Sequence, residues 1–278
     1  MLVRASLNAK HFFIYSIYLY LLMPLFSYVN SENPESKILK ISEIFNSVQG
    51  EGTYSGTPCI FLRLSTCNLK CSWCDTKYTW DWQNYDIKKE IKEISIEKIA
   101  EKLHKFSNIS HLVITGGEPL LQQDKLVLLL VILKDKTSKY NEYKSFQVEI
   151  ETNGTIIPNN EIVKLVNQWN VSPKTSNSHN KKYGIDLDKY YDKSLPFYKE
   201  LKNAYFKFVV DKQEDLKEIE QMLNKHMLPK KRIILMPQAL TKDKLLEKSK
   251  WLEEFAKKND FNFSTRLQVL LWDNQRGK

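Results

Sequence analysis

Three cysteines, Cys67, Cys71 and Cys74, lie within eight residues in the pattern C-x3-C-x2-C. Structural zinc usually needs four ligands in two separated pairs, and no histidine lies at zinc-ligand spacing from these cysteines. A disulfide framework would leave one of the three thiols unpaired. Three thiolates on a short loop can instead bind a four-iron, four-sulfur cluster and leave one iron open for reaction. Cys59 lies in an apolar run, and we expect it to be a buried hydrophobic residue.

Glycines are few and concentrated. The chain has 8 glycines in 278 residues, whereas proteins average about 7% glycine. Six of the eight fall in three short motifs, at Gly50, Gly52 and Gly56, at Gly116 and Gly117, and at Gly154. Glycine permits tight turns and close approach of the backbone to a ligand. The distribution therefore predicts a small-molecule site built from loops.

The elements that must position these residues alternate between strand and helix patterns. Strands are predicted at residues 59–64, 111–115, 146–151, 169–172, 205–210, 233–236 and 267–272, and helices at 96–106, 120–133, 161–168, 212–225 and 242–258. This alternation predicts βαβ units and a parallel sheet. The motifs TGGEP (115–119), ETNG (151–154), SPK (172–174) and MPQ (236–238) each follow a strand. The edge where such motifs meet is where parallel α/β folds bind ligands.

Composition and charge restrict the class of protein. The chain is 42% hydrophobic and 27% charged, which excludes an intrinsically disordered protein. Its 42 basic and 33 acidic side chains give a net charge of +9. The lysines are spread along the chain without a dense run, so the composition itself explains most of this charge. An anionic substrate or a transient RNA contact is compatible with it.

The N-terminal segment differs from the rest of the chain. An uncharged run at residues 12–29 follows Arg4 and Lys10, Pro24 interrupts it, and no clean cleavage pattern follows. A membrane anchor, a targeting segment and an extended gene model all stay open, and the third fits best. We expect residues 1–36 to be an apolar extension and residues 37–278 to form the catalytic domain.

A resemblance to a known family rests on several motifs together. They are FNSVQGEG (45–52), SGTPCIFLRLSTCNLKCSWCDT (55–76), TGGEP, ETNG, SPK, MPQ and the tail LLWDNQRGK. From about residue 38 onward the chain resembles the 7-carboxy-7-deazaguanine synthase family of the radical S-adenosylmethionine superfamily. Thr66 is a departure, because the family usually has glycine before the first cysteine. The resemblance implies an α/β fold with a mostly parallel sheet, arranged as an incomplete β/α barrel.

The resemblance also implies ligand sites. Cys67, Cys71 and Cys74 would bind one 4Fe-4S cluster, and Thr76 would bind Mg²⁺. The residues implied to bind S-adenosylmethionine are Trp73, Cys74, Asp75, Gly116, Gly117, Glu118, Glu151, Thr152, Asn153, Ser172, Pro173, Lys174, Pro237 and Gln238. Those implied to contact a pterin substrate are Val48, Gln49, Gly50, Arg63 and Thr115. Arg63 would bind the pterin carboxylate, since its planar fork takes a carboxylate bidentately.

The reaction implied is conversion of 6-carboxy-5,6,7,8-tetrahydropterin to 7-carboxy-7-deazaguanine with loss of ammonia, on the way to 7-deazapurines such as queuosine. A 5′-deoxyadenosyl radical would abstract hydrogen, and the hydrogen would be returned after ring contraction. The family further implies a homodimer, an electron donor such as flavodoxin or ferredoxin, no direct contact with nucleic acid, and a cytoplasmic location. A reducing compartment suits thiolate ligands, whereas secretion does not.

Two other interpretations stay open at this point. An activase that generates a glycyl radical on a partner enzyme would share the cysteines and GGEP, but it would not need VQGEG. A zinc-knuckle RNA-binding module would account for the clustered cysteines, Trp73 and the positive charge. It needs a fourth nearby ligand and leaves the motifs at the strand ends unexplained.

Overall fold

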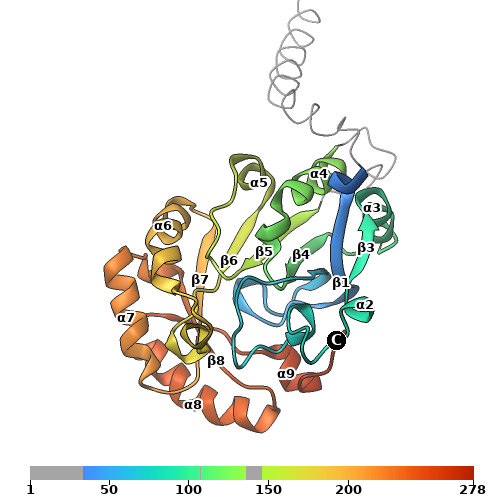
Figure 1. Ribbon diagram of the computed structural model, residues 1–278. Coiled ribbons are helices and arrows are strands. Elements are labelled where there is room, and N and C mark those ends of the chain that lie inside the picture. Colours follow the sequence, from blue (N-terminus) through green and yellow to red (C-terminus); the bar gives the residue numbers. More distant parts are fainter. Residues whose placement is uncertain (1–33, 107, 136–145) are drawn as a thin grey trace, which may run out of the picture.

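A single twisted sheet runs through the computed structural model, which describes residues 34–106, 108–135 and 146–278 (Figure 1). In the described residues the strands are ordered β3-β1-β2-β4-β5-β6-β7-β8-β9. Their bounds are β1 Ile38–Val48, β2 Pro58–Leu64, β3 Lys92–Ser95, β4 His111–Gly116, β5 Gln147–Thr152, β6 Gln168–Val171, β7 Ala204–Val210, β8 Ile233–Pro237 and β9 Asn262–Phe263.

The sheet is mostly parallel. β1 pairs antiparallel with both β2 and β3, and every neighbouring pair from β2 to β9 is parallel. From β4 onward the spatial order follows the chain, so each βα unit adds one strand to the growing edge. The described strands form no ladder between β9 and β3, so the barrel is open. The predicted α/β fold with an incomplete barrel is confirmed.

The helices lie outside the curved sheet (Figure 1). Their bounds are α2 Ile87–Glu90, α3 Ile96–His104, α4 Gln123–Lys134, α5 Asn160–Leu165, α6 Leu187–Glu200, α7 Asp215–His226, α8 Lys242–Lys258 and α9 Leu267–Trp272. The apolar sides of α3 to α8 and the outward residues of the strands make one large core, while Val269 of α9 packs in a separate small cluster with Ala239 and Leu245. Trp169 of β6, for example, packs edge-on against Tyr198 of α6 with ring centroids 5.9 Å apart.

The inner face of the sheet is polar, because side chains alternate between the two faces of a strand. In β7, Phe206 and Phe208 lie in the core while Lys207 between them faces inward. In β5, Val148 and Ile150 lie in the core, which places Glu149 and Glu151 on the inner face. The curved sheet therefore surrounds a set of charged and amide groups.

One predicted element is wrong. Residues 267–272 were expected to form a closing strand and instead form the helix α9. A short apolar run such as LQVLLW does not distinguish strand from buried helix by its periodicity. The strand that pairs with β8 at this edge of the sheet is β9. At the start of α9 the Leu267 amide donates to the Gly50 carbonyl, which follows β1, at 2.9 Å.

Smaller differences lie at the ends of elements. The predicted helix 120–133 begins as a 3₁₀ turn, Pro119–Gln122, before α4, and the predicted helix 161–168 ends as α5 at Leu165. The prediction omitted β1, β3, β9 and α6. None of the helices described in residues 34–278 has both the length and the apolar character that crossing a membrane requires. The apolar run at residues 12–29 lies outside the described residues.

The loop before the first cysteine is packed tightly against the end of β4. A Cβ atom added at Gly117 would lie 1.8 Å from the Thr66 carbonyl oxygen, and one at Gly116 would lie 2.1 Å from the Leu64 carbonyl oxygen. The two glycines are thus required by the packing of protein backbone, whatever else approaches them. Thr66 itself has φ 76°, a left-handed conformation that is costly for a β-branched residue.

We predict that Thr66→Gly stabilises the protein by about 1 kcal/mol, because glycine adopts positive φ without steric cost. Thr57→Gly is the control. Thr57 is absent from the described non-glycine residues with positive φ, so this change should cost about 1 kcal/mol through unfolded-state entropy. Thermal or denaturant unfolding under argon measures both variants. Destabilisation of Thr66→Gly to the same extent as Thr57→Gly would contradict the assignment of strain.

Candidate active site

A cavity of about 470 Å³ opens at the carboxyl edge of the parallel strands. This volume lies within the range of small-molecule sites, about 300–1,000 Å³. Its walls come from the cysteine loop, the ends of the inner strands, and the C-terminal residues 273–278. The four polar motifs predicted at strand ends follow β4, β5, β6 and β8, which are mutually parallel, and each contributes to the lining.

The three clustered cysteines all line this cavity and are free thiols, whereas Cys59 does not line it. Cys59 is fully buried in β2 and packs with Phe61 and Val113, which confirms its expected role as a hydrophobic residue. No three described His, Cys, Asp or Glu side chains are placed to enclose a single metal ion. The described residues therefore lack the ligand set that a zinc knuckle would need.

Each cysteine sulfur of the loop accepts a hydrogen bond from an N–H group. Cys67 accepts from the Leu69 amide at 3.4 Å, and Cys74 accepts from Trp80 Nε1 at 3.4 Å. Cys71 accepts from Asn180 Nδ2 at 3.2 Å, and Asn180 Oδ1 in turn accepts from the Lys70 amide at 2.7 Å. The buried Asn180 amide is therefore held with its donor toward the sulfur.

This donor set fits an iron–sulfur cluster. Burial raises the pKa of the Cys67 and Cys71 thiols above their ordinary value of 9.0. Thiolates are thus disfavoured there until positive charge is added, and iron ions supply such charge. N–H groups directed at cluster sulfurs are among the features that set a cluster's reduction potential.

Most residues predicted to bind S-adenosylmethionine are brought together. Those lining the cavity are Trp73, Cys74, Asp75, Gly116, Gly117, Glu151, Thr152, Asn153, Ser172, Lys174 and Gln238. Lys174 Nζ donates to Ser172 Oγ at 2.7 Å and lies 5.4 Å from the centre of the Trp73 ring. The structure does not place Glu118, Pro173 or Pro237 on the lining, and their direct contact with the cofactor stays a prediction.

Glu118 has protein partners of its own. Its fully buried carboxylate accepts hydrogen bonds from the Thr152 hydroxyl at 2.8 Å and the Asn153 amide at 2.7 Å. Burial raises the pKa of this carboxyl, although these donors oppose the shift. Glu118 therefore joins the end of β4 to the ETNG segment after β5, two segments that line the cavity.

All five residues predicted to contact the substrate, and Thr76, line the same cavity. Arg63 of β2 lies beside Thr115 of β4 in the parallel register. Its Nε donates to Glu43 at 3.2 Å, and the described residues provide no hydrogen bond to its two terminal nitrogens. These two nitrogens are thus available for an anion in the cavity.

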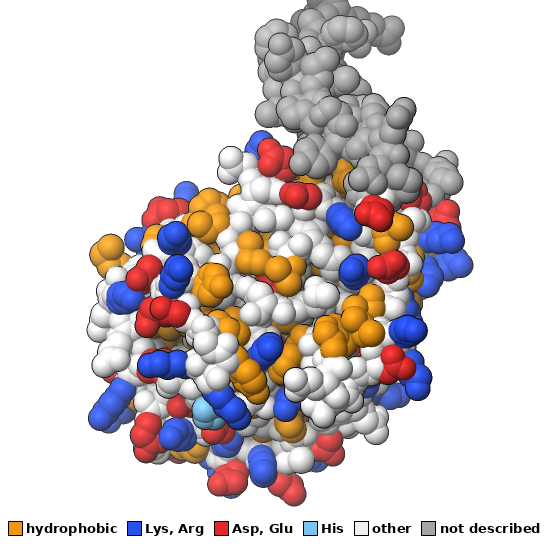
Figure 2. Space-filling model, in the orientation of Figure 1, with side chains coloured by type: hydrophobic (Ala, Val, Ile, Leu, Met, Phe, Trp, Pro, Cys, Tyr) orange, Lys and Arg blue, Asp and Glu red, His pale blue; other side chains and the backbone are white. Residues whose placement is uncertain are grey.

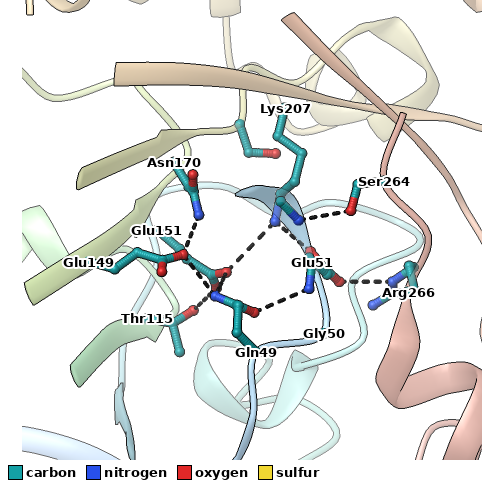
Figure 3. A network of polar contacts seen from close by, with 12 residues as sticks. Gln49, Gly50, Glu51, Thr115, Glu149, Glu151, Asn170, Lys207, Ser264 and Arg266 are labelled. Atoms are coloured by element: carbon teal, nitrogen blue, oxygen red, sulfur yellow. Dashed lines mark hydrogen bonds and ion pairs between the residues drawn. The ribbon is translucent and has the colours of Figure 1, made fainter. Parts of the chain in front are cut away.

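A network of polar contacts lies on the inner face of the sheet (Figure 3). Gln49 Nε2 donates to Glu149 at 2.8 Å and more weakly to Glu151 at 3.3 Å. Glu151 also accepts from the Thr115 hydroxyl at 2.6 Å. Behind them, Glu149 and His111 Nε2 share a hydrogen bond of 2.7 Å, and burial raises the pKa of Glu149. The carboxylates therefore fix the orientation of the Gln49 amide.

Ion pairs complete this network. Lys207 Nζ contacts Glu51 and lies 3.7 Å from Glu151. Arg266 Nε pairs with Glu51 at 3.0 Å, while its terminal nitrogen pairs with Asp75 beside the last cysteine. The end of β1, the cysteine loop, β7 and the segment before α9 are thus joined by buried charges.

Sequence reasoning missed several groups of this site, namely Glu51, Glu149, Asn180, Lys207, Arg266, and Asn170, whose amide donates to Glu149. Lys207 and Glu149 carried a usable signal. A parallel strand buried on both faces normally reads as a nearly continuous apolar run, so a charge in the middle of one indicates an inward polar site. Asn180 begins a short 3₁₀ helix, Asn180–Tyr183, and Arg266 directly precedes α9, so neither lies in a periodic pattern that indicates burial.

The sequence of this chain is similar to those of known proteins over most of its length. The model of the radical SAM superfamily matches residues 63–226. A 7-carboxy-7-deazaguanine synthase of Pyrobaculum aerophilum is 35% identical over 241 residues, covering 86% of this chain and 97% of the relative. The chain belongs to the 7-carboxy-7-deazaguanine synthase family of the radical SAM superfamily.

Further relatives agree with this assignment. The synthase of Hyperthermus butylicus is 31% identical, covering 84% of this chain and 93% of the relative. The crystal structure of QueE from Escherichia coli superposes with a TM-score of 0.58 at 24% identity, covering 86% of this chain and 99% of that one. At this identity the superposition shows a shared fold. The chain is a radical SAM enzyme, and its family implies a 4Fe-4S cluster and S-adenosylmethionine.

We predict that Cys67→Ala, Cys71→Ala and Cys74→Ala each abolish the cluster's brown absorbance and all turnover, because each removes one of three iron ligands. Cys59→Ala is the matched control and should retain both, since Cys59 lies in the core away from the cavity. Iron and sulfide analysis after anaerobic reconstitution measures the outcome. Equal iron content in Cys71→Ala and the parent would refute the ligand assignment.

Proposed function

We propose that this enzyme converts 6-carboxy-5,6,7,8-tetrahydropterin to 7-carboxy-7-deazaguanine and ammonia, a step of 7-deazapurine and queuosine biosynthesis. Family membership supports the reaction. The observation that carries it in the structure is Arg63, whose terminal nitrogens are available in a cavity that Cys67, Cys71 and Cys74 also line. A single cavity can thus hold a carboxylated substrate and the redox groups of the family.

In this proposal, different residues of the cavity bind different parts of the substrate. The Arg63 fork binds the substrate carboxylate in bidentate fashion. Glu151 accepts hydrogen bonds and is oriented by Thr115 and Gln49, so it suits the N–H groups along a pterin edge. When bound, the cluster and S-adenosylmethionine supply the radical that begins the ring contraction. The atoms of the substrate equal those of the product plus ammonia, so the overall reaction needs no further oxidant.

The finer assignments follow from the same chemistry. We propose that Thr76 binds Mg²⁺, since this residue lines the cavity and a hydroxyl oxygen is a ligand that a hard cation accepts.

The domain bounds, the oligomeric state and the location are proposals as well. Residues 1–36 are proposed to lie outside the catalytic domain, and the enzyme is proposed to be a homodimer on family grounds. An oxygen-sensitive cluster suits a reducing compartment, so we propose the cytoplasm.

We also propose a negatively charged one-electron carrier, such as flavodoxin or ferredoxin, as the donor. Lys70, Lys181 and Lys182 are exposed beside the cysteine loop, and the Lys70 amide is joined to Asn180, the donor to Cys71. Direct nucleic-acid binding is not proposed. On the face shown in Figure 2, basic and acidic side chains are interspersed, and no broad field of one sign appears.

The direct test is anaerobic reconstitution with iron and sulfide, followed by incubation with the pterin, S-adenosylmethionine, Mg²⁺ and a reductant. The proposal expects 7-carboxy-7-deazaguanine by mass spectrometry, with ammonia in equal amount. A glycyl-radical activase would leave the pterin unchanged. No product from a protein with a complete cluster would refute the proposed function.

We predict that Arg63→Ala raises the KM for the pterin far more than that for S-adenosylmethionine. Loss of a charge-assisted contact in a partly desolvated site costs on the order of 2–5 kcal/mol. Steady-state kinetics with each ligand varied in turn measure the two constants, and iron content confirms that the cluster is intact. Unchanged pterin binding would mean that Arg63 does not hold the substrate carboxylate.

A further inference from the structure

One carboxylate at the edge of the cavity serves three side chains. Glu43 of β1 accepts from Arg63 Nε at 3.2 Å and from the Tyr78 hydroxyl at 3.3 Å. Its other oxygen accepts from Arg276, in the C-terminal tail. The Glu43 side chain is only 13% exposed, so these charges interact in a partly desolvated setting.

The tail arginine has additional anchors. A terminal nitrogen of Arg276 pairs with Glu90 at 2.7 Å, and its guanidinium lies 3.8 Å from the centre of the Tyr78 ring. Stacking on Tyr78 and pairing with two carboxylates therefore fix a residue that lies two positions before Lys278, the last residue of the sequence. The same tail residues line the cavity.

The charges explain why Arg276 matters to a ligand of Arg63. Arg276 pairs with Glu43 and Glu90, and Glu43 in turn pairs with Arg63. The carboxylates of Asp75 and Glu151 also act electrostatically on Arg63. Without Arg276 these surroundings would lose one positive charge, so an incoming anion would meet a more negative environment. The positive charge of Arg63 would then be neutralised mainly by Glu43, and less of it would attract an anionic substrate.

We propose that Arg276 is a specificity-determining residue for the pterin carboxylate. By neutralising Glu43 it leaves the charge of Arg63 available to the substrate, while Glu43 acts as a positioning residue that holds Arg63 by Nε. The inference rests on the proposed function, because it takes the anion at Arg63 to be the carboxylate of that substrate.

The test compares Arg276→Gln, Glu43→Gln and the double variant under anaerobic turnover. Arg276→Gln should raise the KM for the pterin about tenfold, the effect of one charge interaction of about 1.4 kcal/mol at partial burial. Its KM for S-adenosylmethionine should stay within about twofold. Because glutamine at position 43 can still accept from Arg63 without carrying charge, the double variant should return to within about threefold of the parent.

Conservative and remote changes serve as controls. Arg276→Lys keeps the charge and should retain most of the affinity. Lys258→Gln removes a positive charge from the exposed end of α8 and should change neither KM. Iron content and thermal midpoint show whether each variant is folded and loaded.

Three outcomes would overturn the inference. They are an unchanged pterin KM in Arg276→Gln, a double variant as impaired as Arg276→Gln alone, and Arg276→Lys as impaired as Arg276→Gln. The parent distinguishes this failure from failure of the proposed function. A loaded parent that makes no product refutes the function and the inference with it, whereas an active parent without rescue refutes only the inference.

Discussion

The structure of the site depends on a lysine buried inside the open barrel. Lys207 of β7 contacts Glu51 after β1 and lies 3.7 Å from Glu151 of β5, and Arg266 adds a second cation to Glu51 (Figure 3). Burial alone would raise the pKa of Glu51, but Lys207 and Arg266 outweigh it and hold that pKa below the ordinary 4.5. Conversely, burial would lower the pKa of Lys207, but Glu51 and Glu151 raise it above 10.5. These charged side chains are stable in the protein interior only as a set, since removal of one leaves another buried charge unpaired.

The same set brings distant segments of the chain to one cavity. Arg266 connects Glu51 to Asp75, the residue after the last cysteine, and so ties the cysteine loop to the inner face of the sheet. The helix α9 follows directly and carries the tail to Glu43, where Arg276 completes the surroundings of Arg63. The residues proposed to bind cluster, cofactor and substrate thus share one electrostatic environment.

The parts that the sequence could predict are those fixed by local rules. Alternating strand and helix patterns predicted the parallel sheet, and the four polar motifs at strand ends predicted its binding edge. The tertiary parts could not be predicted, because their determinants are distant in sequence. The Leu267 amide at the start of α9 bonds to the Gly50 carbonyl, and Arg266 is buried where it pairs with Glu51 and Asp75. Thr66 is a second kind of case. The sequence shows threonine where the family usually has glycine, but only the structure shows that this residue has a positive φ.

The most direct measurement compares the stability of Lys207→Met with that of the parent between pH 3 and pH 9. Glu51 has a lowered pKa and contributes above about 4.5, while Lys207 has a raised pKa and contributes below about 10.5, so the pair should stabilise the fold across that window and lose effect as the pH falls below it. The account predicts that Lys207→Met lowers the unfolding free energy at pH 7 by about 3 kcal/mol or more, and that this deficit shrinks as the pH falls below about 4.5 toward the lowered pKa of Glu51. The control Lys231→Met breaks an exposed pair with Asp260 and should leave the unfolding free energy nearly unchanged, since solvent screens this pair. A deficit for Lys207→Met as small as that of the control, or one independent of pH, would contradict the central place given to this network.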